Sequence, residues 1–431
     1  MGHNTEDLGA VIRGARGAAR LTQAQLGGKC GYSASAISRI EGNKLRPEHS
    51  AMLLMAEVLG IPPERLCGSA VPHGPAVATV ASERLSDEED AVRRRELLAG
   101  ALAAGATAIV GAGASSAAAA VSGDPAASLE EALFRLPAAD AVPLAVLTAQ
   151  TVAARRTFQA ARYSDLGQSL PGLLAAAAAT RDAATGRARQ QAAAVLARAY
   201  VLTAELAAKQ HSDAAWVAAD RALTAARASG SPVPVGEASR VLAITMRRSG
   251  RWSSAVNLLT REATELDPSE ERTAAVRTTL LLTAAYSAAS GGDRSTALAL
   301  LDEAEEDTER LPEVQGLFTV EATRAQVDVY RIGVLNALGT PDEGVKVAAG
   351  LNIGFMPTPE RRARAWTDTA RMWHALGDGP QTFAALRRVE QEAPQEVQRP
   401  ALWALTSDLL YGPARVQGLR EFAIRTGALA A

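Results

Sequence analysis

A chain of 431 residues exceeds what one hydrophobic core usually supports, so the sequence predicts at least two structural units. Alanine runs dominate and aromatic residues make up only 4% of the chain, which favours helices throughout and excludes a sheet-rich fold. The formal net charge of −2 excludes a strongly basic protein as a whole, although residues 1–67 carry eight Lys and Arg against six Asp and Glu. Cys30 and Cys67 are the only cysteines, which is typical of a reducing compartment, so we expect a cytoplasmic protein.

Residues 8–20 predict a first helix, because apolar residues recur there at helical spacing. Its inward positions are Leu8, Val11, Ile12 and Ala15. A second, short helix begins at Thr22, because Thr22 and Gln25 have the spacing of a capping box, in which each side chain bonds the other residue's amide. Gly31 permits the tight turn that follows this helix.

A third short helix is expected from Ser33, which can cap it. Ile37 and Ile40 fall on its inward side, and its outward positions are Ala34, Ser35, Ser38 and Arg39. Pro47 in a first turn and Gly60 past the last turn frame a fourth helix. The residues expected to close the core from this helix are Leu53, Leu54, Ala56 and Leu59.

The segment LTQAQLGGKCGYSASAISRIEGNKLRP, with its surroundings over residues 8–66, resembles the phage-repressor-type (XRE) family of helix-turn-helix DNA-binding domains. The resemblance implies a five-helix domain over residues 1–67 whose third helix faces base edges in the major groove of double-stranded DNA. Arg39 is then the candidate for bidentate contact to guanine, and Gln23, Lys44 and Arg46 match positions that hold phosphates. The full implied set is Gln23, Ser33, Ala34, Ser35, Ser38, Arg39, Lys44 and Arg46.

Two features depart from the family pattern. Gly27-Gly28 replaces the usual alanine-containing pair, and the base-facing set is poor in Asn and Gln, so part of the specificity is expected from DNA shape or a partner site. The alternative is a compact domain of the same fold that contacts protein instead of DNA.

Residues 68–126 have linker composition, with Pro, Gly, Ser and an acidic cluster followed by three arginines. Within them, residues 97–121 form a run of 25 residues without a charge. Its length would allow a membrane span with the N-terminal domain in the cytoplasm. Its Ala and Gly contribute little transfer free energy, however, so we favour a packed helix or flexible linker over a membrane span.

Residues 127–431 predict a domain of repeated helix pairs, because amphipathic segments alternate with short Gly, Pro, Ser and Asp breaks. The second helices of the pairs are expected to open near Tyr163, Ser212, Trp252, Arg294, Pro341, Pro380 and Pro413. Their joints resemble those of tetratricopeptide repeats, which implies an α-solenoid. The segments at 156–178 and 197–227 resemble the C-terminal domain of actinobacterial XRE regulators, and the excess of Arg over Lys with abundant Ala is typical of a GC-rich genome.

The concave face of such a solenoid suits a peptide, a small molecule or a protein partner. Candidate ligand-binding residues are polar or aromatic positions on apolar helices: Arg247, Tyr286, Arg324, Tyr330, Asn336, Arg371 and Trp373. The five histidines are scattered and no catalytic constellation is indicated, so we expect no enzyme, no metal and no cofactor.

The sequence therefore predicts a ligand-responsive, homodimeric DNA-binding transcription regulator. The alternatives are a protein-interaction scaffold and a membrane-anchored sensor with a cytoplasmic DNA-binding domain.

Overall fold

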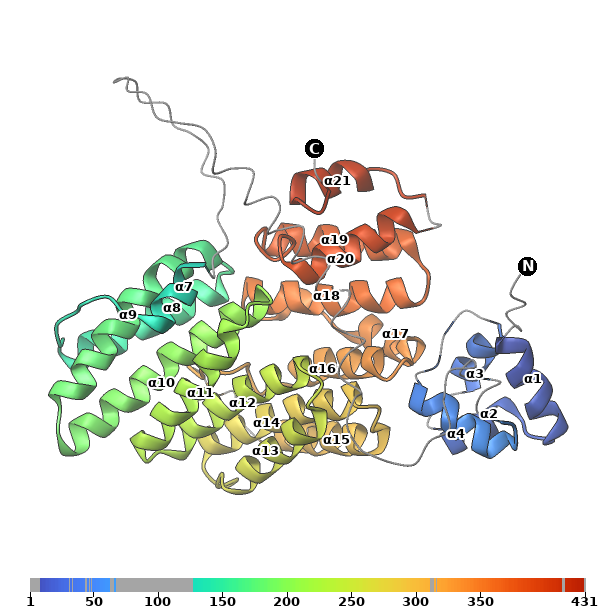
Figure 1. Cartoon of the computed structure of the whole chain (residues 1–431), viewed down its shortest axis with the longest axis horizontal. Coiled ribbons are helices and arrows are strands. Elements are labelled where there is room, and N and C mark those ends of the chain that lie inside the picture. The colour runs from blue at the N-terminus through green and yellow to red at the C-terminus, as the bar shows by residue number, and fades with distance from the viewer. Residues whose placement is uncertain are drawn as a thin grey trace, which may run out of the picture.

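The computed structural model describes residues 8–62 and 66, apart from Gly31, Ser33, Asn43, Lys44, Arg46 and Glu48, and residues 127–429, apart from 311–313, 315, 413 and 414. Within these ranges every regular element is a helix, so the all-α expectation is confirmed for them (Figure 1). The linker prediction for 68–126, including the apolar run 97–121, lies outside the described residues. None of the helices described is both long and apolar enough to cross a membrane.

The N-terminal domain contains α1 (Leu8–Ala18), α2 (Gln23–Cys30), α3 (Ala34–Glu41) and α4 (His49–Leu59). Its core is a separate cluster in which Ile12, Leu26, Ile37 and Met55 are fully buried. The predicted inward face of the first helix is confirmed, because the other apolar residues of that face pack against this cluster. Leu66 is helical and buried, and the rest of the expected fifth helix falls outside the described residues.

The fourth helix differs from its prediction. It begins at His49, so Pro47 precedes it, and Leu54 is 40% exposed rather than part of the core. Met52 and Met55 take the inward positions beside Ala56 and Leu59. Residues 51–56 are all apolar, so the exposed Glu57, three residues after Leu54, is the main polar mark of the outward side of this helix.

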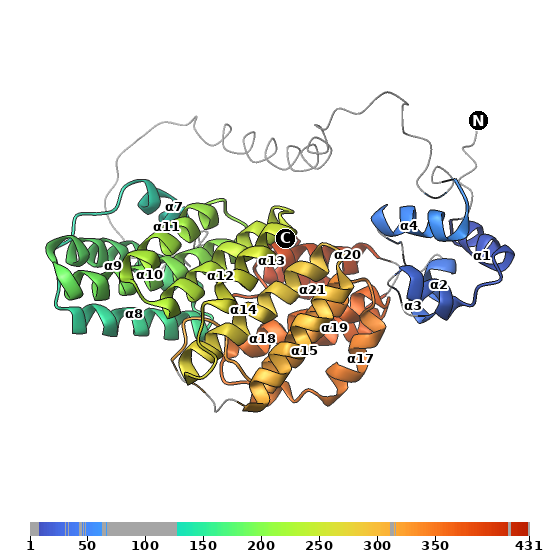
Figure 2. The ribbon, with the colours of Figure 1, turned by 90° about the horizontal axis from the view of Figure 1, so that it is seen from below.

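The C-terminal domain is a succession of helices (Figures 1 and 2). In chain order they are α7 (Ala127–Phe134), α8 (Leu144–Gln159), α9 (Tyr163–Ala183), α10 (Gly186–Lys209), α11 (Ala214–Ser229), α12 (Pro232–Arg248), α13 (Trp252–Thr264), α14 (Glu271–Ser290), α15 (Arg294–Arg310), α16 (Arg324–Ala337), α17 (Pro341–Gly350), the 3-10 helix η1 (Ile353–Phe355), α18 (Pro359–Ala375), α19 (Gly379–Glu392), α20 (Pro400–Tyr411) and α21 (Leu419–Thr426).

The predicted openings of the second helices agree with these bounds. Four of them fall on the first residue of a helix, at Tyr163, Trp252, Arg294 and Pro341. The openings expected at Ser212 and Pro380 lie within two residues of the starts of α11 and α19. Pro413 lies outside the described residues, and the last helix begins only at Leu419. The joints before α13 and α15 turn through Gly250 and Gly292, whose positive φ angles of 72° and 78° favour glycine.

Contacts between alternate helices define two layers. The inner helices α8, α10, α12, α14, α16 and α18 each contact the next, and α18 contacts α8, so the inner layer closes into a ring. The outer helices α9, α11, α13, α15, α17 and α19 pack against this ring from outside. Each inner helix therefore has another inner helix on either side. Polar side chains of these helices meet within the ring.

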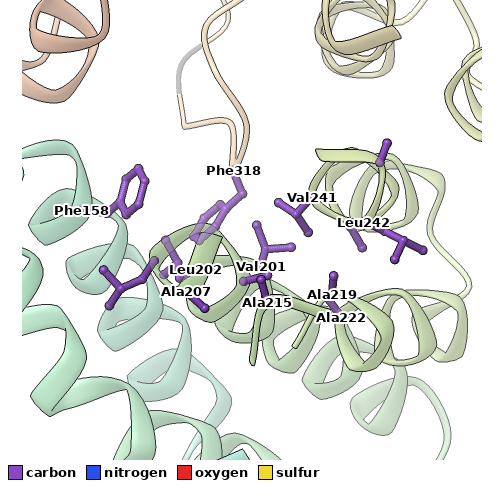
Figure 3. Packing of buried hydrophobic residues seen from close by; sticks show 14 of the residues in the cluster. Phe158, Val201, Leu202, Ala207, Ala215, Ala219, Ala222, Val241, Leu242 and Phe318 are labelled. Carbon is purple, nitrogen blue, oxygen red and sulfur yellow. The ribbon is translucent and has the colours of Figure 1, made fainter. Parts of the chain in front are cut away.

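Alanine allows the layers to approach closely. On α11, Ala215, Ala219 and Ala222 are fully buried and face Val201 of α10 and Val241 of α12 (Figure 3). Small residues at these positions bring helix axes together without large side chains to separate them. The same buried cluster extends from α7 to α21 and forms the main core of the C-terminal domain, and a smaller cluster contains Val329, Ile353, Met356 and Ala365.

The tightest approach in the N-terminal domain is that of α1 to the end of α3. A Cβ atom added at Gly9 would lie 2.6 Å from the carbonyl oxygen of Glu41, whereas one added at Gly14 on the same helix would meet nothing within 4 Å. Gly9→Ala should therefore destabilise the N-terminal domain by about 2 kcal/mol, because the backbone of α3 has to move. Hydrogen exchange of the α1–α3 amides in the full-length protein measures this effect.

Gly14→Ala is the matched control and should raise the stability of α1 by roughly 0.5–1 kcal/mol, since it only removes the flexibility of glycine from a helix. Equal protection of the α1–α3 amides in the two variants would contradict the close approach.

Candidate nucleic-acid interface and charged interior

The turn into α2 has the geometry expected from its sequence. The amide of Thr22 donates to Oε1 of Gln25 at 2.8 Å, and the amide of Gln25 donates to Oγ1 of Thr22 at 3.1 Å. The predicted capping box is therefore confirmed. It fixes where α2 begins and so how α2 presents α3, with which it packs.

The inward and outward faces of α3 also agree with the prediction. Ile37 and Ile40 are buried, Ala34 and Ser38 are exposed, and Arg39 is partly exposed. Ser35 lies on α3, but its side chain is outside the described part of the chain. Ser33, Lys44 and Arg46 lie entirely outside the described residues. The roles predicted for these residues and for Ser35 at DNA therefore remain predictions.

A buried carboxylate joins the first three helices. Glu41, which is 3% exposed, accepts from Nη2 of Arg16 at 3.1 Å and from Nε2 of Gln23 at 2.9 Å, and its carbonyl oxygen accepts from Nη2 of Arg13 at 2.6 Å. Gln23, predicted to hold a phosphate, is thus engaged inside the domain in this structure. Glu41 was not predicted from the sequence, although a glutamate directly after Ile40 and two arginines on the first helix were visible signals.

This environment changes the acidity of Glu41. Burial alone would raise the pKa of its carboxyl group, but the hydrogen bonds from Arg16 and Gln23 and the positive charge of Arg16 outweigh burial and lower it. Glu41 is therefore ionised in the folded domain, and its ion pair with Arg16 orients α1 against α3.

The predicted base-contacting residue is in contact with the C-terminal domain. Nη2 of Arg39 donates to the carbonyl oxygen of Ala375 at 2.6 Å, and Nη1 lies 3.8 Å from Oδ1 of Asp342. A Cβ atom added at Gly339 would lie 3.9 Å from the ring of Tyr32. The end of α18, the first turn of α17 and the joint between α16 and α17 therefore face α3. Nothing in the local sequence of either partner indicated this contact.

Inside the ring, charged side chains link helices that are distant in sequence. Nζ of Lys209 on α10 lies 2.7 Å from Glu360 of α18 and 2.5 Å from Glu396, which also pairs with Arg399. The hydroxyl of Tyr163 donates to the same Glu396. The two carboxylates are nearly inaccessible to solvent, so each depends on these partners for its charge.

A second group of interior contacts contains two of the predicted ligand-binding residues. Arg240 donates to Glu205 at 3.1 Å and to the hydroxyl of Tyr330 at 3.1 Å. The ring of Tyr330 packs edge-on against Tyr286 with centroids 6.4 Å apart. Burial alone would raise the pKa of Tyr330, but the charge and hydrogen bond of Arg240 lower it to about 8.

The structure brings together five of the seven predicted ligand-binding residues along the ends of the inner helices: Arg247, Tyr286, Tyr330, Asn336 and Arg371. Arg324 is separate from them, because it is 56% exposed and pairs with Glu305 and Asp328 between α15 and α16. Trp373 is half-buried, and among the described residues no ring contact joins it to the other five. The residues that sequence reasoning missed are Tyr163, Lys209, Glu360, Arg364, Asp368 and Glu396.

Comparison with known proteins identifies the N-terminal domain. Residues 7–66 match a family model described as a helix-turn-helix domain. No curated protein and no solved structure matches the chain. The N-terminal domain therefore belongs to the helix-turn-helix class of DNA-binding folds, as its sequence predicts. Among the residues described, no cluster of His, Cys, Asp and Glu has an arrangement that could hold a metal ion.

The acidity of Glu41 leads to a test of the N-terminal domain. Its pKa is lower in the folded than in the unfolded state, so its contribution to stability is present above the ordinary glutamate pKa and is lost as the pH falls through the folded value. Glu41→Gln should cost about 2 kcal/mol at pH 7, because Arg16 loses its buried partner.

The cost of Glu41→Gln should shrink as the pH falls below 4, and hydrogen exchange of the α1–α3 amides, corrected for intrinsic rates, measures both values. A cost that is the same at pH 7 and at low pH would show that the charge of Glu41 is not what stabilises the domain.

Proposed function

We propose that the chain is a sequence-specific DNA-binding transcription regulator whose helical-repeat domain responds to a ligand. The observation that carries this proposal is the helix-turn-helix match over residues 7–66, together with an α3 helix that buries Ile37 and Ile40 and turns Ala34, Ser38 and Arg39 outward. The proposal includes membership of the XRE family, tetratricopeptide-like repeats, an actinobacterial source and a cytoplasmic location, all of which rest on sequence resemblance and composition.

In this proposal α3 enters the major groove of double-stranded DNA. Arg39 donates two hydrogen bonds from its guanidinium to the O6 and N7 atoms of one guanine. Ala34, Ser35 and Ser38 make short-range contacts that discriminate weakly between bases. Lys44, Arg46 and the start of α2 neutralise phosphates and set the register. A homodimer would place two such helices about one turn of DNA apart.

The contact of Arg39 with the C-terminal domain defines when DNA can bind. A guanidinium that donates to Ala375 and faces Asp342 cannot at the same time donate to a guanine. We therefore infer that this structure is the DNA-free arrangement and that operator binding requires α3 to leave α17 and α18. A ligand of the repeat domain could act on that step.

One alternative receives support from the same contact. Because α3 already contacts protein, the chain is also suited to be a protein-interaction scaffold. In that function the helix-turn-helix domain would bind protein instead of DNA. The two functions differ in what the purified protein does with DNA, because a scaffold shows no preference among duplexes.

The first test is the specificity of Arg39. Duplexes selected from a random pool by the full-length protein define its preferred site, and binding to that site is compared with a scrambled one. Arg39→Ala should reduce the preference by about 1–3 kcal/mol at one base pair, because it removes a bidentate contact. The substitution also removes the hydrogen bond from Arg39 to Ala375, but this loss changes the affinity for every duplex equally. The difference in affinity between the preferred and the scrambled duplex therefore measures the base contact alone.

Lys44→Ala is the control, since loss of a phosphate contact should weaken all duplexes and reduce the salt dependence. An Arg39→Ala variant with unchanged preference would refute the assignment, and a parent protein without any preference would favour the scaffold.

The second test addresses the contact between the domains. Asp342→Asn should raise the affinity for all duplexes by up to about fivefold, because a long, partly exposed ion pair contributes up to roughly 1 kcal/mol to the closed arrangement. Glu343→Gln is a matched control, since Glu343 is the adjacent residue but pairs with Arg294 instead. Equal DNA affinity of these two variants would contradict a competing role for the Arg39–Asp342 contact.

A further inference from the structure

Two guanidinium groups from different inner helices share one aromatic ring. The guanidinium carbon of Arg247, at the end of α12, lies 4.4 Å from the ring centroid of Tyr286 on α14. That of Arg364 on α18 lies 5.8 Å from the same centroid. Like charges are brought together here by a ring that attracts each of them.

Carboxylates do not balance these charges. Asp368, which is 1% exposed, pairs with Arg364 at 2.8 Å and with Arg371 at 3.4 Å. Arg247 has no carboxylate partner within the described part of the chain, although it faces the same group of residues. Two guanidiniums therefore share one carboxylate and the third has none among the described residues, which leaves an excess of positive charge.

Solvent reaches the side chains that carry this excess. The side chains of Arg364 and Arg371 are 27% and 33% exposed, and Arg247 is half-buried, so solvent contacts all three. Their surroundings are nevertheless those of an interior, because burial lowers the pKa of Arg247 and the nearby charges of Arg364 and Arg240 lower it further. An anion placed among them would gain more than at an open surface.

Asn336 holds the backbone of Asp368 in this group. Nδ2 of Asn336 on α16 donates to the carbonyl oxygen of Asp368 at 2.9 Å, while its Oδ1 is buried and accepts from no described residue. One turn earlier, Gly333 allows the close approach of Tyr286, since a Cβ atom there would lie 2.5 Å from the tyrosine ring. Asn336 and Tyr286 are thus held on the same side of α16.

His211 lies near one of these arginines. Burial and the charges of Arg248, Arg399 and Arg371 lower the pKa of His211 to about 4. Arg371 therefore faces both Asp368 and His211, which connects the histidine to the group around Tyr286.

We propose that this end of the ring is a binding site for a small organic oxyanion, a carboxylate or a phosphoester. Arg247, Arg364 and Arg371 donate hydrogen bonds to its charged oxygens, and Tyr286 packs against its body. The proposal deepens the proposed function, because it gives the repeat domain its class of ligand.

The experiment uses the full-length protein with citrate and inorganic phosphate as probes and chloride at the same ionic strength as the reference. Isothermal titration should show binding of at least one probe above the chloride reference, and Arg247→Gln should weaken it by about tenfold, because one charge-assisted fork is lost. Arg251→Gln is the matched control, since Arg251 lies over the ring of Trp216 at 5.5 Å at an exposed outer joint. This control should bind as the parent does.

Stronger binding of citrate would identify a carboxylate ligand, and stronger binding of phosphate a phosphoester. Equal affinities of the parent, Arg247→Gln and Arg251→Gln, or no binding of either probe above chloride, would overturn the proposal.

A second measurement does not depend on the folding of a variant. In the parent protein, the bound probe should raise the pKa of His211 in a histidine NMR titration, because it offsets the charge of Arg371, one of the three arginines that lower this pKa. A pKa of His211 that is unmoved by a saturating probe would also overturn the proposal. DNA binding is measured separately, so a protein that binds the anion but no duplex would retain this site while refuting the regulator.

Discussion

Closure of the inner ring depends on buried charge that has to be paired. The ammonium group of Lys209 lies between the carboxylates of Glu360 and Glu396, which follow it by 151 and 187 residues in the sequence. An interior carboxylate without such a partner would cost several kcal/mol, so neither the early nor the late helices can move away alone. The alanine-rich core supplies the apolar burial, and these ion pairs determine which helices meet across the ring.

Helix α18 connects the features that matter for function. Its first turn provides Glu360 to the ring closure, its middle carries Arg364 and Asp368 beside Tyr286, and the carbonyl oxygen of its last residue, Ala375, accepts from Arg39. A ligand among the arginines and the helix-turn-helix domain would therefore address neighbouring turns of one helix. In such an arrangement a small shift at one end of α18 also displaces the other end, because a packed helix moves largely as a rigid unit.

The sequence predicted those parts of the fold that follow from local chemistry. The capping box at Thr22, the burial of Ile37 and Ile40, and the starts of helices at Tyr163 and Trp252 each depend on residues close together in the chain. The rotation of α4 was mispredicted at Leu54, since the six consecutive apolar residues 51–56 leave few polar side chains to mark the outward side of the helix.

The interior network could not be predicted in the same way. The pairing of Lys209 with Glu360 and the contact of Arg39 with Ala375 join residues more than a hundred positions apart, and no periodicity marks such partners. Polar residues on apolar helices did point to Arg247, Tyr286 and Asn336, but the same criterion selected Arg324, whose side chain is exposed at the start of α16.

The central claim is that α3 reads base edges through the guanidinium of Arg39. The most direct measurement replaces single guanines of the preferred duplex by 7-deazaguanine, which lacks the N7 acceptor while base pairing is retained. The account predicts one guanine in each half-site whose replacement weakens binding of the parent protein by roughly tenfold but leaves the Arg39→Ala variant unaffected. Identical losses in the parent and the variant at every guanine, or no loss at any, would contradict it.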